Sequence, residues 1–103
     1  MSYKNTISII GGAGHIGFPL GLAFANKNFL VNLIDLNTEN LDKIKRGQVP
    51  FYEISAKKML DKCLKKKKLF FYNDISAITK SKFVIICIGT PVDKNLKPKT
   101  KEF

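Results

Sequence analysis

Apolar positions along the chain fall into short continuous runs and into longer stretches with helical spacing. The continuous runs are rich in β-branched and aromatic side chains, and they occupy residues 7–10, 29–35, 69–72 and 83–88. Runs of this kind are typical of strands buried on both faces of a parallel sheet. We therefore predict four strands at these positions.

Between the first two runs, apolar residues recur at intervals of three and four, which predicts a helix over about residues 15–27. Pro19 falls in its first turn, where a missing N–H is tolerated. The residues predicted to face the sheet are Ile16, Leu20, Ala23 and Phe24.

Further helices are predicted at about residues 38–46 and 55–67 from the same spacing. Asn37 is expected to cap the N-terminus of the first of these, and Gly47 its C-terminus. Asp74 is expected to cap a brief helix before the last strand. Strands that alternate with helices indicate an α/β fold with a parallel sheet, and we expect the strand order 3-2-1-4 of half a doubly wound sheet.

A glycine-rich turn connects the first predicted strand directly to the first predicted helix. Its glycines fit the spacing G-x-G-x-x-G as Gly12, Gly14 and Gly17. In a dinucleotide site the first glycine permits a sharp turn, the second lets backbone approach a pyrophosphate, and the third allows close packing of helix on strand. Unpaired N–H groups at the helix N-terminus then attract phosphates.

A carboxylate, Asp35, stands at the end of the second predicted strand, about 20 residues beyond the glycine turn. At that place a carboxylate accepts hydrogen bonds from the adenosine ribose and repels a 2′-phosphate, which favours NAD over NADP. The structural alternative is that Asp35 only begins the turn before the next helix. Thr90 follows the fourth predicted strand and is expected at the same edge of the sheet.

Composition narrows the choice of partners. The net charge is +10 and every basic residue except Arg46 is lysine, which is poorly suited to bidentate contacts with phosphates or bases. The sequence contains no nucleic-acid motif, so we expect no nucleic-acid partner.

No apolar run is long enough to span a bilayer, and the N-terminus lacks the layout of a signal peptide. We therefore expect no membrane contact and a cytoplasmic protein.

Two cysteines, Cys63 and Cys87, form no C-x-x-C pair, and both fall among apolar residues. They are predicted to be small buried hydrophobes rather than reactive thiols. The sequence indicates no metal site.

Several motifs together resemble the N-terminal NAD-binding domain of the UDP-glucose/GDP-mannose dehydrogenase family. They are the glycine turn followed by Pro-Leu, the Pro-x-Tyr-Glu segment at residues 50–53 and the Gly-Thr-Pro that ends the last strand at residues 89–91. The resemblance implies a Rossmann-type fold and an NAD-dependent oxidoreductase. Such enzymes oxidise the C6 alcohol of a UDP-sugar or related nucleotide sugar to a carboxylate with two NAD. The glycine turn looks most similar to enzymes that resemble UDP-N-acetylmannosamine dehydrogenase.

By match with the family, the pyrophosphate and adenosine side of the cofactor would be lined by Gly12, Gly14, Ile16 and Gly17. Asp35 would hold the adenosine ribose, and Thr90 would approach the cofactor from the fourth strand. His15, where the family often has tyrosine, is assigned to the cofactor site as a packing or capping residue rather than a catalytic base. Asn40 replaces a basic residue that often follows the ribose carboxylate.

In the family the nucleophilic cysteine, its lysine and asparagine partners and most of the nucleotide-sugar site lie beyond the position of Phe103. We therefore expect residues 1–103 to be a partial NAD-binding domain without central and C-terminal domains, inactive by itself. The full-length parent is expected to be a homo-oligomer that takes a nucleotide sugar as substrate. Two alternatives are left open: another NAD-dependent dehydrogenase with the same first half, such as a 6-phosphogluconate or hydroxyacyl-CoA dehydrogenase relative, and a non-catalytic nucleotide-binding module.

Overall fold

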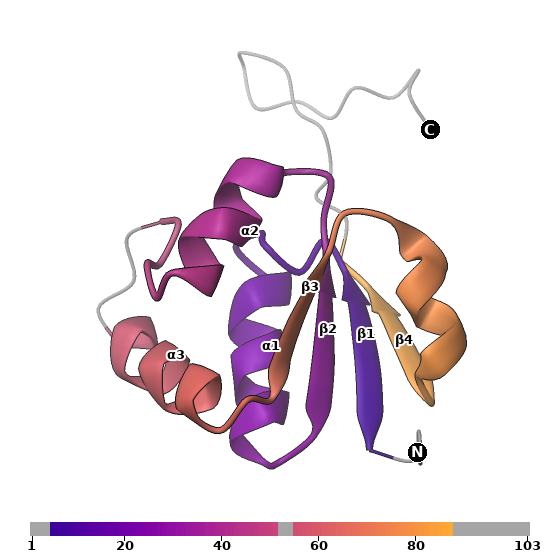
Figure 1. The fold of residues 1–103 in the computed structure, drawn as a ribbon, viewed down its shortest axis with the longest axis horizontal. Helices are drawn as coiled ribbons and strands as arrows, with labels where there is room; N and C mark the ends of the chain where they lie inside the picture. The colour runs from indigo at the N-terminus through magenta and orange to yellow at the C-terminus, as the bar shows by residue number, and fades with distance from the viewer. Residues whose placement is uncertain (1–4, 52–54, 88–103) are drawn as a thin grey trace.

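The computed structural model of the chain describes residues 5–51 and 55–87. In this part, a parallel sheet has three α-helices on one face and a short 3-10 helix on the other (Figure 1). The strands are β1 (Thr6–Ile10), β2 (Leu30–Ile34), β3 (Leu69–Tyr72) and β4 (Phe83–Ile86). The helices are α1 (Gly17–Asn26), α2 (Thr38–Lys45), α3 (Ala56–Lys65) and the 3-10 helix η1 (Ile75–Lys80).

The strand order is β3-β2-β1-β4, and every neighbouring pair is parallel, as predicted. Ile10 lies opposite Ile34 on one side and Ile86 on the other, while Ile34 lies opposite Tyr72. The carboxyl ends of the strands therefore meet along one edge of the sheet. In open α/β sheets this edge is where ligands bind.

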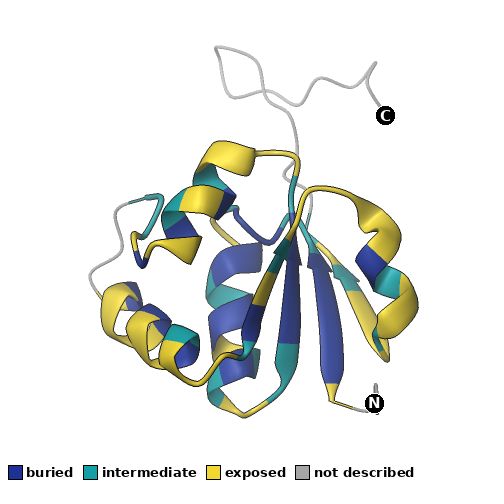
Figure 2. Ribbon diagram, in the orientation of Figure 1, coloured by how far each residue is buried: buried dark blue, intermediate teal, exposed yellow. Residues whose placement is uncertain are grey.

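The core lies between the sheet and the α-helices, where β1 is buried except at Ile10 and β2 is buried except at Leu30 (Figure 2). Ile9, Leu33 and Phe18 are fully buried there. Burial of one such side chain is worth roughly 1.5–3 kcal/mol. Leu60 and Cys63 of α3 close the same core from the far side of α1, so the helical layer is anchored through α1 to β1 and β2.

The predicted buried face of α1 is wrong. Ile16 precedes the helix and is 71% exposed, Ala23 is exposed, and Leu20 and Phe24 are only half-buried. The residues that are buried are Gly17, Phe18, Gly21, Leu22 and Ala25. The reason is close approach: a Cβ on Gly21 would lie 2.7 Å from Cδ2 of Leu33, so α1 turns its glycine side towards β2. Counting apolar side chains alone does not detect a face built on glycine.

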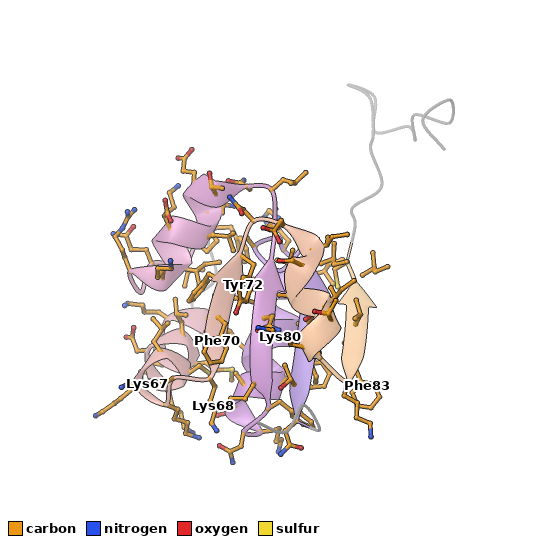
Figure 3. The ribbon with its side chains drawn as sticks, turned by 45° about the vertical axis from the view of Figure 1, so that its right-hand side comes forward. Lys67, Lys68, Phe70, Tyr72, Lys80 and Phe83 are labelled. Atoms are coloured by element: carbon orange, nitrogen blue, oxygen red, sulfur yellow. The ribbon has the colours of Figure 1, made fainter. Side chains whose placement is uncertain are left out.

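The second face of the sheet is covered in part by η1 and carries a buried polar pair. Nδ2 of Asn32 donates to Oγ of Ser8 at 3.1 Å, which satisfies both side chains inside the sheet. Between η1 and β3, a hollow of about 230 Å³ on this face is lined in part by Phe70 and Tyr72 of β3 and by Lys80, the last residue of η1 (Figure 3). η1 therefore leaves the β3 side of the second face partly open.

β4 is the outer strand beside β1 in the described part of the chain, and its side chains are poorly covered. Phe83 is 52% exposed, Val84 43% and Ile86 63%. Because an uncovered apolar edge promotes association, we expect the isolated chain to be marginally stable and to form oligomers or aggregates. Light scattering should detect this association, and the substitution Val84→Lys should reduce the association.

Gln48→Lys is the matched control, since it adds the same charge at an exposed loop position away from β4. It should leave association unchanged. A clean wild-type monomer with a sharp thermal transition would contradict the expectation.

Candidate functional site

The chain leaves β1 through a turn that is bonded to the end of β2. The N–H groups of Gly11 and Gly12 donate to the carbonyl of Ile34 at 2.7 and 3.0 Å. The sharp turn that the sequence assigned to Gly12 belongs to Gly11, whose φ is +83°. A Cβ on Gly12 would instead lie 2.9 Å from Cα of Leu33, so this glycine permits close packing on β2.

The other two glycines of the motif have different surroundings. A Cβ on Gly17 would lie 2.2 Å from the carbonyl oxygen of Gly11, so this glycine lets the start of α1 pack closely on the turn, whereas the sequence assigned it close packing on the strand. A Cβ on Gly14 would meet only that same oxygen, at 3.4 Å, an ordinary contact. The fold therefore requires glycine at 17 but does not require it at 14, where the open side faces a cleft.

Asp35 lies between the glycine turn and α2. Its Oδ2 accepts from the N–H of Ala13 and its Oδ1 from the N–H of Asn37, both at 3.0 Å. The residue thus begins the turn before α2, and it also reaches the glycine turn 22 residues earlier. Each carboxylate oxygen has a second acceptor position, so the half-buried group can still accept from ribose hydroxyls.

The N-terminus of α1 offers backbone donors next to Gly14. Among the described residues, the N–H groups of His15 and Ile16 have no hydrogen-bond acceptor. A helix N-terminus with free N–H groups favours anions through both hydrogen bonds and the helix dipole. This is the chemistry that a pyrophosphate needs.

A cleft of about 530 Å³ lies beside the carboxyl ends of β1, β2 and β3. Its lining residues are Ile10, Gly11, Gly14, Ile34, Asp35, Leu36, Asn73, Asp74, Ile75 and Cys87. A second hollow of about 470 Å³ is lined by Gly11, Gly14, His15, Ile16, Gly17, Ile86 and Cys87. The two share Gly11 and Gly14 of the glycine turn and Cys87 after β4, so they form one continuous groove of the size that small ligands occupy.

The groove brings together most of the residues that the sequence predicted. Asp35 lines its first part, and His15, Ile16 and Gly17 line its second, with Gly14 between them. Gly12 is buried beneath the turn and lines neither part. Thr90 lies outside the described residues.

Sequence reasoning missed the residues that follow β2 and β3 on the other wall of the cleft. Leu36 is 89% exposed and Ile75 60%, and both line the cleft that Asp35 enters. Exposed aliphatic side chains at a concave site are suited to covering the faces of a flat base. The sequence did contain a signal for this wall of the cleft. Asn73 and Asp74 directly follow β3, and the carboxyl ends of parallel strands meet at one edge of the sheet.

His15 packs on an aromatic ring, in agreement with the packing role predicted for it. Its ring centroid lies 4.3 Å from that of Phe51, with the ring planes 25° apart. Phe51 also meets Phe18 edge-to-face at 5.8 Å. The segment after α2 is thereby held against the start of α1.

The two cysteines differ in how far they are buried. Cys63 is fully buried, as predicted, and its burial raises the pKa of its thiol, which makes it a poor nucleophile. Cys87 is only half-buried and lines both parts of the groove, so the prediction that it is a buried hydrophobe is wrong. Within residues 5–51 and 55–87 no cluster of three His, Cys, Asp or Glu could hold a metal, and no helix has the length and apolarity to cross a membrane.

A parallel sheet of this order, with a glycine turn after β1 and a carboxylate after β2, defines a dinucleotide-binding domain of the Rossmann type. The chain belongs to the UDP-glucose/GDP-mannose dehydrogenase family, whose NAD binding domain model matches residues 5–102. NAD is accordingly the cofactor of this domain.

Curated and solved relatives agree with this assignment. UDP-glucose 6-dehydrogenase TuaD from Bacillus subtilis is 34% identical over 85% of the chain. The structure of GDP-mannose dehydrogenase from Pseudomonas aeruginosa is 26% identical over 93% of the chain, with a TM-score of 0.81. The UDP-N-acetyl-mannosamine dehydrogenase Cap5O from Staphylococcus aureus is 27% identical over 86%, with a TM-score of 0.76. The chain spans 19%, 22% and 21% of these three proteins.

Proposed function

We propose that this chain is the NAD-binding part of a nucleotide-sugar 6-dehydrogenase, which oxidises the C6 alcohol of a UDP-sugar to a carboxylate with two NAD. The observation that carries the proposal is the continuous groove over the glycine turn, with Asp35 at one end and free helix N–H groups at the other. The names of the relatives support a nucleotide sugar as the substrate.

The residues of the groove fit the parts of NAD. Gly14, without a side chain, lets the pyrophosphate approach the backbone, where the N–H groups of His15 and Ile16 are free to donate. The carboxylate of Asp35 accepts from the hydroxyls of the adenosine ribose, and Leu36 and Ile75 flank the adenine. Bound NAD supplies the hydride acceptor, while the role of this chain is to bind and orient it.

Thr90 is proposed to approach the cofactor from the side of the fourth strand, on the basis of the family motif alone. Residues 1–103 are proposed to form only the first part of the cofactor domain, with the sugar-binding and catalytic segments supplied by a longer parent. Homo-oligomeric association of the parent and its cytoplasmic location stay predictions from the sequence.

The test is turnover by the full-length parent with NAD and a panel of nucleotide sugars. We expect NADH formation with UDP-glucose or UDP-N-acetylmannosamine, at two NADH for each sugar consumed, and we expect no turnover by residues 1–103 alone. Activity with 6-phosphogluconate or a hydroxyacyl-CoA instead would refute the substrate assignment. A folded parent that binds no NAD would refute the proposal as a whole.

A further inference from the structure

The adenosine end of the groove has a charge opposite to that of the chain. The chain contains 18 Lys and Arg against 8 Asp and Glu, yet the described residues that line the 530 Å³ cleft include two acidic residues, Asp35 and Asp74, and none of them is basic. Asn40 stands where the family often has a basic residue, and its Nδ2 donates to the carbonyl of Ala13 at 3.5 Å. The cleft is therefore locally negative within a basic protein.

Asp74 reaches this cleft because of the sheet register. β2 and β3 are parallel neighbours, and the N–H of Asp35 donates to the carbonyl of Tyr72 at 3.1 Å. Asp74 follows Tyr72 by two residues, so the two carboxylates leave the carboxyl ends of adjacent strands and line one cleft.

The carboxylate of Asp74 is held in place and is charged. Its Oδ1 accepts from the N–H of Ser76 at 2.8 Å and from the Ser76 hydroxyl, and these hydrogen bonds lower the pKa of Asp74. Its other oxygen has no partner among the described residues, and Asp74 lines the cleft. The cap of η1 thus also fixes a negative charge at the adenosine site.

We propose that Asp74 is a second determinant of cofactor choice, acting with Asp35 to exclude the 2′-phosphate of NADP. The inference rests on the proposed binding of NAD in this groove. A phosphate monoester carries about two negative charges at neutral pH, so a fixed carboxylate within ~10 Å disfavours it about three- to tenfold. NAD, which has hydroxyls there, is not subject to this repulsion.

Asp74→Asn tests the proposal, because the amide oxygen keeps an acceptor for the N–H of Ser76 while the charge is lost. We expect the Kd for NADP to fall about fivefold at low salt, and the Kd for NAD to change less than about twofold. The gain should shrink at high salt, since the repulsion is screened. An NADP-to-NAD affinity ratio equal to that of wild type, or a gain insensitive to salt, would overturn the proposal.

Asp61→Asn is the matched control, since it makes the same change on α3, where Asp61 pairs with Lys57 and lines no part of the groove. It should leave the affinity ratio unchanged, and a shift as large as that of Asp74→Asn would overturn the proposal. Circular dichroism checks that each variant is folded. If folded wild-type protein binds neither cofactor, the NAD site itself fails; if it binds NAD and the ratio does not respond to Asp74→Asn, only the inference about Asp74 fails.

Discussion

Gly14→Val is expected to abolish measurable NAD binding while the domain stays folded. A Cβ at this position would meet only the carbonyl oxygen of Gly11, at 3.4 Å, so the fold can accept a side chain. The valine would stand in the groove where its two parts join, between the pyrophosphate and the backbone it must approach. We expect the Kd for NAD to rise at least about 100-fold, or about 2.7 kcal/mol, by calorimetry.

Gly17→Ala provides the contrast, since it should weaken the fold first. Its Cβ would lie 2.2 Å from the backbone oxygen of Gly11, so the backbone of the turn or of the helix start would have to shift. We expect a loss of about 2–4 kcal/mol in the free energy of unfolding, with NAD binding lost as a consequence. If Gly14→Val unfolded the chain as severely, or bound NAD normally, the separation of roles at the turn would be wrong.

Asp35→Ala is expected to affect both binding and stability. The substitution removes the ribose acceptor and also leaves the N–H groups of Ala13 and Asn37 without their carboxylate partner. Hydrogen bonds to a charged group are worth about 1.5–3 kcal/mol, so we expect the Kd for NAD to rise about 10- to 100-fold and the free energy of unfolding to fall by about 1–3 kcal/mol. Calorimetry and thermal unfolding measure the two effects.

Asp42→Ala is the control for this loss of charge, because Asp42 is exposed on α2 and lines neither part of the groove. Asp42→Ala should change neither the Kd for NAD nor the free energy of unfolding appreciably. Undiminished NAD affinity in Asp35→Ala would show that the carboxylate has only the turn-forming role.

Predictions that depended on neighbours in the sequence were confirmed. Asn37 caps α2, where its side chain accepts from the N–H of Asn40 at 3.0 Å, and Asp74 caps η1 in the same manner. Gly47 ends α2 with a φ of +82°, a conformation that glycine adopts without steric cost. Such features need only a few consecutive residues, so the local pattern is sufficient to find them.

Predictions that depended on distances between elements were less successful. The buried face of α1 was wrong because Gly21 packs on Leu33, and the sharp turn was placed one residue late because Gly11 packs on the carbonyl of Cys87. Leu36 and Ile75 were not recognised as walls of a cleft. In each case the deciding contact joins residues from different strands or helices.

The amino-acid pattern by itself determined the order of the elements, the parallel sheet, the glycine turn and the presence of a carboxylate after β2, because backbone preferences and burial periodicity act over short stretches. Only the tertiary structure decided which glycine forms the sharp turn, which glycine leaves room for a ligand, and which carboxylates line the same cleft. These depend on how closely β1, α1, β2 and β3 approach one another, which is set by packing across the sheet rather than by any single segment.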